Sequence, residues 1–349
     1  MARALRGAAM NGSPRPTLHD VAACAGVSIA TVSRVLNGTG IIRPATEAKV
    51  REAVRQLGFR PNRMGRDLRM GQSRSIGVLL PTLANPVFAD SAAGIQEAAR
   101  DAGWTVLITS SDYDTGHEQA AMDGLLSERV AGLIITVADA GTCPVLDSLD
   151  DERVPYVLFH NESPNPARSS VAVDNARAGH DAAQTLIAHG HRRLGMVAGR
   201  FVASDRSRSR HAGFIRAVRA AGLPEPDLIE IDFNSDLACE TLRAAFLNPK
   251  RPTGIFCSND LLALRTIAGL RELGLAVPRD VSVIGMDGIN VGQLIAPSLA
   301  SIVQPAREMG RRAFAHLLAR IAGEAEPEQI RLPHIYRPGQ SLSAAQQQE

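Results

Sequence analysis

From Ser75 onward, short apolar runs alternate with longer segments of helical periodicity. Runs such as SIGVLLP, WTVLIT and AGLIIT are continuously apolar, which is typical of strands buried on both faces of a parallel sheet. The helical segments between them supply the crossover connections that parallel strands require. The rhythm then repeats, with RLGMVAG, GIFCSND and VSVIGMD as further strands. The pattern therefore predicts an α/β core of two doubly wound parallel-sheet units, with a ligand cleft between the carboxyl ends of their strands.

The first part of the chain has a different pattern, in which short helices surround Gly26. We expect three helices: 18–25 with Thr17 as its N-cap, a second that follows Ser28 and ends at Asn37, and a third that Thr46 caps and that ends near Leu57. Gly26 supplies the conformational freedom that a tight turn needs. The second helix buries Val32, Val35 and Leu36, which leaves small, polar and basic side chains on its other face. This pattern predicts an all-α helix-turn-helix headpiece.

Charge is divided unequally between the two parts. Residues 1–75 hold 13 Lys and Arg residues against four acids and carry +9, whereas the whole chain carries +2, which leaves −7 for the remainder. An isolated pair of short helices could equally be an amphipathic hairpin with no role in nucleic-acid binding. A strongly basic end on an acidic core favours a module that binds phosphates.

The headpiece motif GVSIATVSRVLN, followed by RPN six residues ahead of a leucine, resembles the lactose-repressor and purine-repressor family. The core motifs VDNARAG, HGHRRLG, CSND, VPRDVSVIGMD and PSLASIVQP occur in the order found in that family. The resemblance covers the headpiece and extends from Ile76 to about Arg337. It implies a transcriptional regulator, most simply a repressor, with a core of periplasmic-binding-protein type.

The resemblance also implies where the parts begin and end. The expected division is a disordered basic tail at 1–16, the headpiece at 17–61, a hinge at 62–74, the core at 75–341 and a disordered tail at 342–349. Because the family's chain crosses between subdomains three times, the first subdomain would comprise 75–171 and 302–331. The second would comprise 172–301 and 332–341.

The resemblance assigns DNA contacts to residues of the headpiece and hinge. These are Thr17, Ser28, Ile29, Ala30, Thr31, Ser33, Arg34, Asn37, Thr46, Asn62 and Leu68. Ile29, Ala30 and Arg34 would meet base edges in the major groove. The hinge would fold into a short helix on DNA and wedge Leu68 into the minor groove, and Gly65 would weaken that helix.

Effector contacts are expected from side chains that follow strands of the core. By position and by resemblance these are Asn85, Phe88, Thr136, His160, Arg210, Phe233, Asn259 and Asp287. An aromatic face surrounded by Asp, Asn and Arg suits a small polyol such as a sugar, and the planar Arg210 fork suits paired hydroxyls or a carboxylate. Phe88 could instead pack its helix, and His160 could be either a protonatable contact or a structural histidine.

Three polar residues that lie close in sequence to the expected effector contacts, and one histidine motif, are expected to have other roles. We interpret Arg206 and Arg208 as solvated surface side chains. Asp260 is expected to cap the helix that follows it. The motif HGH at 189–191 lies at a helix end before a strand, where a C-terminal cap is the simplest account.

Other functional classes have little support. The sequence holds no Gly-x-Ser-x-Gly elbow, Walker loop, Gly-x-Gly-x-x-Gly after a strand or His-Glu-x-x-His, so we expect no catalysis, cofactor or metal. A solute-binding protein of the sugar-transport type, and less readily an α/β enzyme, are the alternatives for the core. No apolar run is long enough to span a membrane and no secretory signal is evident.

The remaining features point to a cytoplasmic homodimer. Four cysteines lie far apart without Cys-x-x-Cys spacing, at Cys24, Cys143, Cys239 and Cys257, which predicts reduced thiols. A twofold dimer would place two helix-turn-helix units in successive major grooves of a partly palindromic operator. The final residues PGQSLSAAQQQE contain no leucine heptad, so a dimer is favoured over a tetramer.

Overall fold

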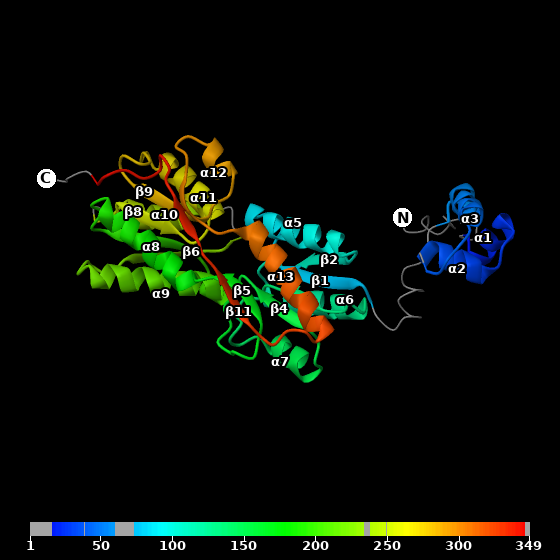
Figure 1. Cartoon of the computed structure of the whole chain (residues 1–349). Coiled ribbons are helices and arrows are strands. Elements are labelled where there is room, and N and C mark those ends of the chain that lie inside the picture. The colour runs from blue at the N-terminus through cyan, green and yellow to red at the C-terminus, as the bar shows by residue number, and fades with distance from the viewer. Residues whose placement is uncertain (1–15, 38, 60–72, 234–237, 249, 346–349) are drawn as a thin grey trace, which may run out of the picture. The chain divides into compact units, whose positions relative to one another are not determined.

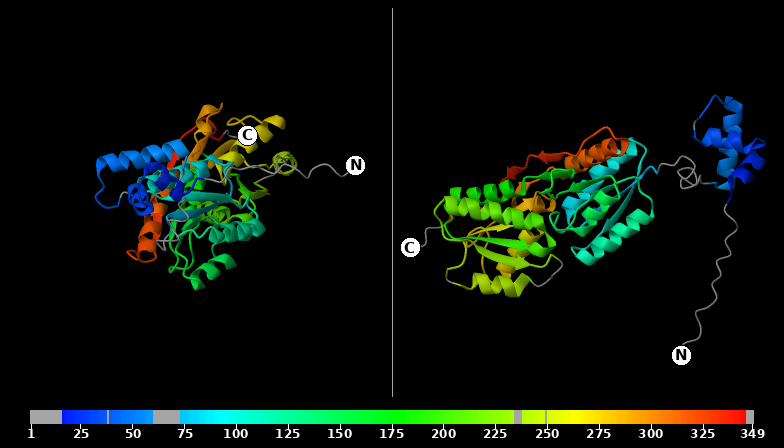
Figure 2. Two further views of the ribbon diagram at one scale, coloured as in Figure 1. Left: turned by 90° about the vertical axis from the view of Figure 1, so that its right-hand side faces the viewer. Right: turned by 90° about the horizontal axis from the view of Figure 1, so that it is seen from below.

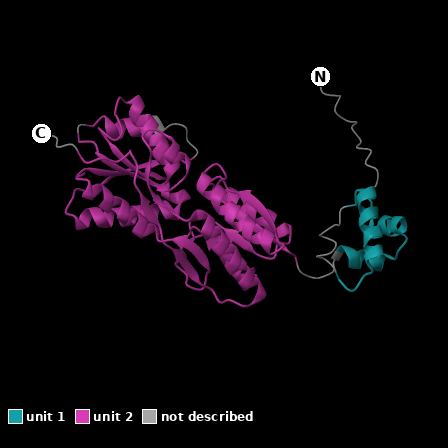
Figure 3. Ribbon diagram, turned by 45° about the horizontal axis from the view of Figure 1, so that its top comes forward, with its two compact units in different colours: residues 1–72 teal, residues 73–349 magenta. Residues whose placement is uncertain are grey.

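The computed structural model describes residues 16–37, 39–59, 73–233, 238–248 and 250–345. The chain divides into two compact units, 1–72 and 73–349, which Figure 3 shows in different colours. Most of the predicted hinge lies outside the described residues, including Asn62, Gly65 and Leu68, and so does nearly all of the predicted tail at 1–16.

The described residues of the headpiece unit form three helices, α1 (Leu18–Ala25), α2 (Ile29–Asn37) and α3 (Pro44–Leu57). The hydroxyl of Thr17 accepts from the backbone of Asp20 and the Asp20 carboxylate accepts from the Thr17 backbone, which forms a capping box. Gly26 ends α1 in the left-handed conformation with φ 64°, as the predicted turn requires. Ser28 Oγ accepts from the Thr31 amide at 3.2 Å and so caps α2.

The start of the third helix differs from the prediction. Helix α3 begins at Pro44 rather than after Thr46, and its N-cap, Arg43, makes no side-chain cap bond. The fixed φ of proline suits the first helical position, where its missing N–H costs nothing. Thr46 therefore lies inside the first turn. The three helices share a core that includes Val21, Val32 and Val50.

The first subdomain of the core is a six-stranded sheet. Its strands are β1 (Ser75–Leu80), β2 (Thr105–Ser110), β3 (Leu133–Ile135), β4 (Tyr156–Phe159), β5 (Ser170–Val173) and β11 (Gln329–Leu332), in the order β11-β5-β4-β3-β1-β2, all paired in parallel. Helices α5 (Pro86–Asp101) and α13 (Ala306–Ala322) cover one face, and α6 (Thr115–Ser127) and α7 (Pro144–Asp151) cover the other (Figure 1). Successive β1 residues alternate between these layers, since Val78 packs towards α5 and α13 and Leu79 towards α6 and α7.

The second subdomain repeats this plan. Its strands are β6 (Leu194–Gly199), β7 (Asp227–Ile231), β8 (Gly254–Cys257), β9 (Ser282–Asp287), β10 (Ala300–Val303) and β12 (Ile335–Arg337), in the order β12-β10-β9-β8-β6-β7. Helices α8 (Asn175–Ala188) and α9 (Asp205–Ala220) cover one face, and α10 (Ala238–Phe246) and α11 (Asp260–Glu272) the other. The short helices η1 (Phe201–Ala203) and α12 (Val291–Leu294) lie in connections. The predicted doubly wound parallel sheets are confirmed, except that β12 pairs antiparallel with β10.

Glycines bring the outer helices of each subdomain into close contact. A Cβ atom added to Gly179 on α8 would lie 1.9 Å from the Arg210 carbonyl oxygen on α9, and one on Gly213 of α9 would lie 1.7 Å from the Ala176 oxygen. The α5 and α13 pair is built in the same way, since a Cβ on Gly94 would lie 2.0 Å from the Arg307 oxygen. Both helix pairs lie side by side in Figures 1 and 2. Only glycine allows backbones to approach this closely.

Several expected boundaries differ from the observed elements. Strand β5 runs to Val173 and so passes the boundary expected at 171. Strand β10 belongs to the second sheet and runs from Ala300 to Val303, so the second subdomain extends beyond the boundary expected at 301. Strand β11 likewise extends one residue beyond 331. The tail expected to be disordered from 342 is ordered as far as Ala345, because the Ser343 amide donates to Ser282 Oγ at 3.1 Å and the Ala345 amide to the His189 carbonyl at 2.8 Å.

Candidate functional site

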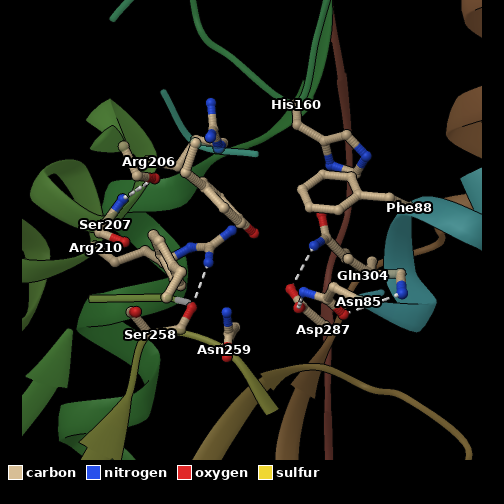
Figure 4. A pocket seen from close by; sticks show the side chains of 14 residues that line it. Asn85, Phe88, His160, Arg206, Ser207, Arg210, Ser258, Asn259, Asp287 and Gln304 are labelled. Carbon is tan, nitrogen blue, oxygen red and sulfur yellow. Dashed lines mark hydrogen bonds between the residues drawn. The ribbon is translucent and has the colours of Figure 1, made fainter. Parts of the chain in front are cut away.

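A cleft lies between the two subdomains of the core. Residues at or just after the carboxyl ends of eight strands line it, and these are Asn85, Tyr113, His160, Ser204, Phe233, Ser258, Asp287 and Gln304, for β1, β2, β4, β6, β7, β8, β9 and β10 respectively. In Figure 4, Arg206, Ser207 and Arg210 of α9 face Phe88, Asn85 and Gln304 across this space. This is the ligand position expected for open parallel sheets.

Asp287 is the acidic group of the cleft. Its carboxylate accepts from Asn85 Nδ2 at 3.2 Å and from Gln304 Nε2 at 2.7 Å, so it joins elements of both subdomains. Burial raises the pKa of Asp287 to about 6, against the opposing effect of Arg210. Its backbone has φ 116°, a conformation that non-glycine residues rarely adopt and that tends to mark functional sites.

Asp287 is held in place by a second buried carboxylate. Asp260 Oδ2 accepts from the Ile289 amide at 2.7 Å, and its Oδ1 accepts from Ser301 Oγ at 2.7 Å. Burial raises the pKa of Asp260 to about 8. The expected cap role of Asp260 is wrong, because Asn259 occupies the N-cap of α11 and accepts from the Leu262 amide at 2.7 Å. The reason is that the helix begins one residue earlier than expected, which turns Asp260 towards the loop after β9.

Arg210 is the main donor on the opposite wall. Its Nε donates to Asn175 Oδ1 at 2.9 Å and its Nη1 to the Ser258 carbonyl at 2.5 Å. Within the described part of the chain, no carboxylate lies within ion-pair distance of this buried guanidinium. A planar donor fork held by two neutral oxygens is well placed to bind a further acceptor in the cleft.

His160 is a neutral part of the wall. Its pKa is lowered to about 3, first by burial and then by repulsion from Arg206 and Arg210. Its Nε2 lies 3.0 Å from Ser91 Oγ, and its ring meets the Phe88 ring edge-on at 5.2 Å. The possibility of a protonatable contact is therefore not supported, because the ring stays neutral in the physiological pH range.

An aromatic pair spans the cleft between the subdomains. The rings of Tyr113 and Phe233 are stacked with centroids 4.2 Å apart. Tyr113 has φ 61°, in the left-handed region, which turns the chain after β2. Burial raises the pKa of the Tyr113 hydroxyl, so the phenol remains protonated and can donate.

Polar contacts also join the subdomains beside the cleft. The Asp205 carboxylate at the start of α9 accepts from Asn161 Nδ2 at 2.8 Å and from the Ala140 amide at 3.0 Å. Arg206 Nη1 donates to the Val137 carbonyl at 2.8 Å. At the surface, Arg208 pairs with Asp139 at 2.8 Å.

Helix α2 of the headpiece has one exposed and one buried face. Ala30 and Arg34 are exposed, whereas Ile29, Thr31 and Ser33 are partly buried. Val32 and Val35 on the other face are buried in the three-helix core. A helix with one packed face and one small, basic face is the form that enters a major groove.

Comparison with known proteins gives the same two parts. Residues 73–339 match the family described as periplasmic binding proteins and sugar binding domain of LacI family, and residues 17–62 match bacterial regulatory proteins, lacI family. The chain belongs to the LacI family. It is a transcriptional regulator with a DNA-binding headpiece and an effector-binding core, as the sequence predicted.

Individual LacI-family relatives match over nearly the whole chain. Catabolite control protein A of Priestia megaterium is 32% identical over 321 residues, which cover 91% of this chain and 96% of the relative. A crystal structure of the lac repressor dimer bound to operator and the anti-inducer ONPF has a TM-score of 0.84 and 27% identity, covering 94% of this chain and 99% of that one. The transcriptional regulator CelR–cellobiose complex has a TM-score of 0.69 and 30% identity, covering 94% and 100%.

Seven of the eight residues predicted for the effector site of this LacI-family chain line the cleft. These are Asn85, Phe88, His160, Arg210, Phe233, Asn259 and Asp287. Thr136 is absent from the lining. It follows β3, but its side chain is fully buried and its Oγ1 donates to the Phe159 carbonyl at 2.8 Å. Its hydroxyl is bonded to the backbone of the neighbouring strand β4 and does not face the cleft.

Several lining residues were missed by sequence reasoning. Arg206, interpreted as a surface residue, is only 5% exposed because the first subdomain covers the start of α9, whereas Arg208 is exposed as expected. Tyr113, Ser204, Ser207, Ser258 and Gln304 also line the cleft. Tyr113 follows the predicted strand WTVLIT, so strict use of the strand-end rule would have found it, whereas Gln304 follows β10, which was not among the predicted strands.

Two further features concern the residues that the structure describes. No helix among them is long and apolar enough to cross a membrane. The part of the chain that the structure describes contains no group of three or more His, Cys, Asp or Glu residues that could hold a metal ion.

Proposed function

We propose that this protein is a homodimeric repressor whose affinity for a partly palindromic operator is controlled by a small sugar-like effector in the cleft. The observation that carries the proposal is a DNA-reading headpiece joined to a core whose polar cleft residues come from both subdomains. A ligand that contacts both subdomains binds their alternative arrangements unequally, and this inequality is what allows it to control a distant site.

For DNA binding, we propose that α2 reads the major groove. The bases would be met by Ile29, Ala30 and Arg34, with Arg34 paired to guanine, and phosphates by Thr17, Ser28, Thr31, Ser33, Asn37 and Thr46. Ala30 and Arg34 are exposed on α2, as this role requires. Asn62 and Leu68 keep the hinge roles proposed from the family.

For assembly, we propose a twofold dimer. The similar lac repressor structure is a dimer bound to operator. In the present core, Val291 and Leu294 of α12 expose 40% and 77% of their surface. Exposed apolar side chains of this kind are suited to an interface. A twofold axis would present two copies of α2 to a palindromic site. Since the chromosome is the target, we place the protein in the cytoplasm.

For the effector, we propose that Arg210, Asp287, Asn259 and Phe233 hold a polyol. The support is their position around the cleft and the occurrence of cellobiose with the similar regulator CelR. A thermal-shift screen of sugars, sugar acids and purines against the purified protein tests this, because a ligand that binds only the native state raises its unfolding temperature. Each hit is repeated with Asp287→Ala, which should lose the shift.

The same variants test control of DNA binding. Arg210→Ala and Asp287→Ala should bind operator within a few-fold of the parent in gel-shift titrations but give no calorimetric heat with the ligand. In cells, loss of an inducer site leaves target genes permanently silent, whereas loss of a co-repressor site leaves them permanently expressed. If both variants keep full ligand affinity, the effector binds elsewhere and the proposal fails.

A further inference from the structure

The start of α9 places two buried arginines in the cleft. Arg206 is 5% exposed and Arg210 is 6% exposed, and both line the cavity with Ser204 and Ser207 of the same helical turn (Figure 4). Burial of one guanidinium is costly unless it is paired with a negative charge, and burial of two in one cavity is more so. The charges that surround Arg206 and Arg210 in the protein therefore indicate which charge the ligand must carry.

The lining supplies one carboxylate against the two cations of this pair. Arg210 is bound by the neutral oxygens of Asn175 and Ser258. Asp287 is the only carboxylate among the described lining residues; it attracts Arg210, and each of its oxygens accepts one bond, from Asn85 or from Gln304.

Among the described residues, Arg206 has one carboxylate within ion-pair distance, and that carboxylate lies outside the lining. Arg206 Nη1 is 3.3 Å from Asp205 Oδ1 and 2.8 Å from the Val137 carbonyl. The Asp205 carboxylate also accepts from Asn161 and Ala140, which hold it between the subdomains. Arg206 is thus held by two groups outside the lining, the Val137 carbonyl and the Asp205 carboxylate. None of the described lining residues accepts a hydrogen bond from it.

We propose that the effector carries an acidic group and that Arg206 is the residue that selects it. The inference rests on the proposed function of the cleft as the effector site and narrows the ligand class. The ligand class is then a sugar derivative that carries a carboxylate or a phosphate, since the two guanidinium groups line the cleft together. Arg206 and Arg210 hold the anionic oxygens, while Asp287 and Asn259 accept from and donate to the hydroxyls.

Arg208 offers a matched control on the same helix. It lies two residues beyond Arg206, its side chain is 50% exposed, and it also contacts the first subdomain through Asp139. Replacing either arginine by glutamine removes one cation and one contact between subdomains. Only Arg206→Gln removes a charge from the cavity. If the substitutions acted only by weakening the contact between the subdomains, ligand affinity would fall in both variants and for every ligand.

The test is calorimetric titration of the full-length protein with matched compounds: glucose, gluconate and glucose 6-phosphate, and the corresponding galactose series. We expect an acidic member to bind tightest, with the gluconate and phosphate arms distinguishing the two kinds of anion. Arg206→Gln should weaken its binding by about ten- to a hundredfold, as loss of a charged hydrogen bond does. Arg208→Gln should change it less than about threefold, and Arg206→Lys should restore part of the acid preference.

The outcomes separate this inference from the function on which it rests. If no acid binds, or if Arg206→Gln weakens an acid and its neutral parent equally, the acidic effector is overturned. Binding of a neutral sugar that Asp287→Ala abolishes would overturn it as well, yet leave the cleft as the effector site. An acid that binds equally well to Arg206→Gln, Arg210→Ala and Asp287→Ala would refute both the inference and the proposed function.

Discussion

The contact between α8 and α9 predicts a large effect from a single methyl group. In Gly179→Ala, the new Cβ would lie 1.9 Å from the Arg210 carbonyl oxygen, whereas ordinary contacts begin at 3.4 Å. The two helices would have to separate by about 1.5 Å. Overpacking of this kind costs about 1 to 3 kcal/mol. Because the clashing atom is backbone, no side-chain rotation can relieve it.

The glycine on α6 provides the control. A Cβ on Gly124 would meet nothing within 4 Å, so Gly124→Ala should stabilise the helix by about 1 kcal/mol. The two alanine variants should therefore differ by about 2 to 4 kcal/mol in the free energy of unfolding. Urea denaturation of the full-length protein, compared at equal slopes, measures this difference.

Gly179→Ala should also alter the effector cleft. Displacing the Arg210 backbone moves its guanidinium away from Asn175 and Ser258, which hold it at 2.9 and 2.5 Å. Gly179→Ala should therefore weaken effector binding, and Gly124→Ala should not. If Gly179→Ala unfolds at the parent urea concentration and binds effector with the parent affinity, the close approach of the two helices is not as described.

Three further predictions concern single side chains. Arg34→Ala should cost about 1 to 3 kcal/mol on operator DNA and little on random DNA in gel-shift titrations; an equal loss on both would mean that Arg34 touches only phosphate. Because the pKa of Asp287 is raised to about 6, a ligand that needs its ionised form should bind about tenfold more weakly at pH 5 than at pH 7, and calorimetry with Asp287→Asn should give no such dependence. The pKa of Asp260 is raised from 3.8 to about 8, so the folded state keeps a proton that the unfolded state loses, and the free energy of unfolding falls as pH rises from about 4 to about 8. Asp260→Asn should reduce the difference between the unfolding free energies measured in urea at about pH 5 and at about pH 8. An unchanged difference would mean that another group titrates.

Local signals in the sequence were sufficient for much of the fold. Thr17 and Ser28 cap α1 and α2 because their hydroxyls satisfy amides within a few residues, and Gly26 is required where φ is positive. The continuous apolar runs became parallel strands because a strand covered on both faces needs apolar side chains in every position. These relations depend on neighbours in the chain, so the sequence reveals them directly.

Positions of cleft residues could be predicted as far as strand ends determine them. Asn85 follows β1 and Asp287 ends β9, and parallel strands bring their carboxyl ends to one edge. Thr136 follows the same rule and still lies outside the cleft, because its side chain points into the sheet to reach the Phe159 carbonyl. The end of a strand is a local property, whereas the direction of the last side chain depends on register.

Tertiary structure alone decided the character of the cleft. Arg206 lies in a run of basic and polar residues that predicts a solvated surface position, yet the first subdomain covers it. Burial is what allows this side chain to contact a ligand in the cleft, as we propose. Asp260 and Asp287 look alike in sequence, but only packing raises the pKa of one to about 8 and of the other to about 6. Sequence determined which side chains were available at each strand end. Burial, which depends on segments far away in the chain, decided which of them remain charged and which face the ligand.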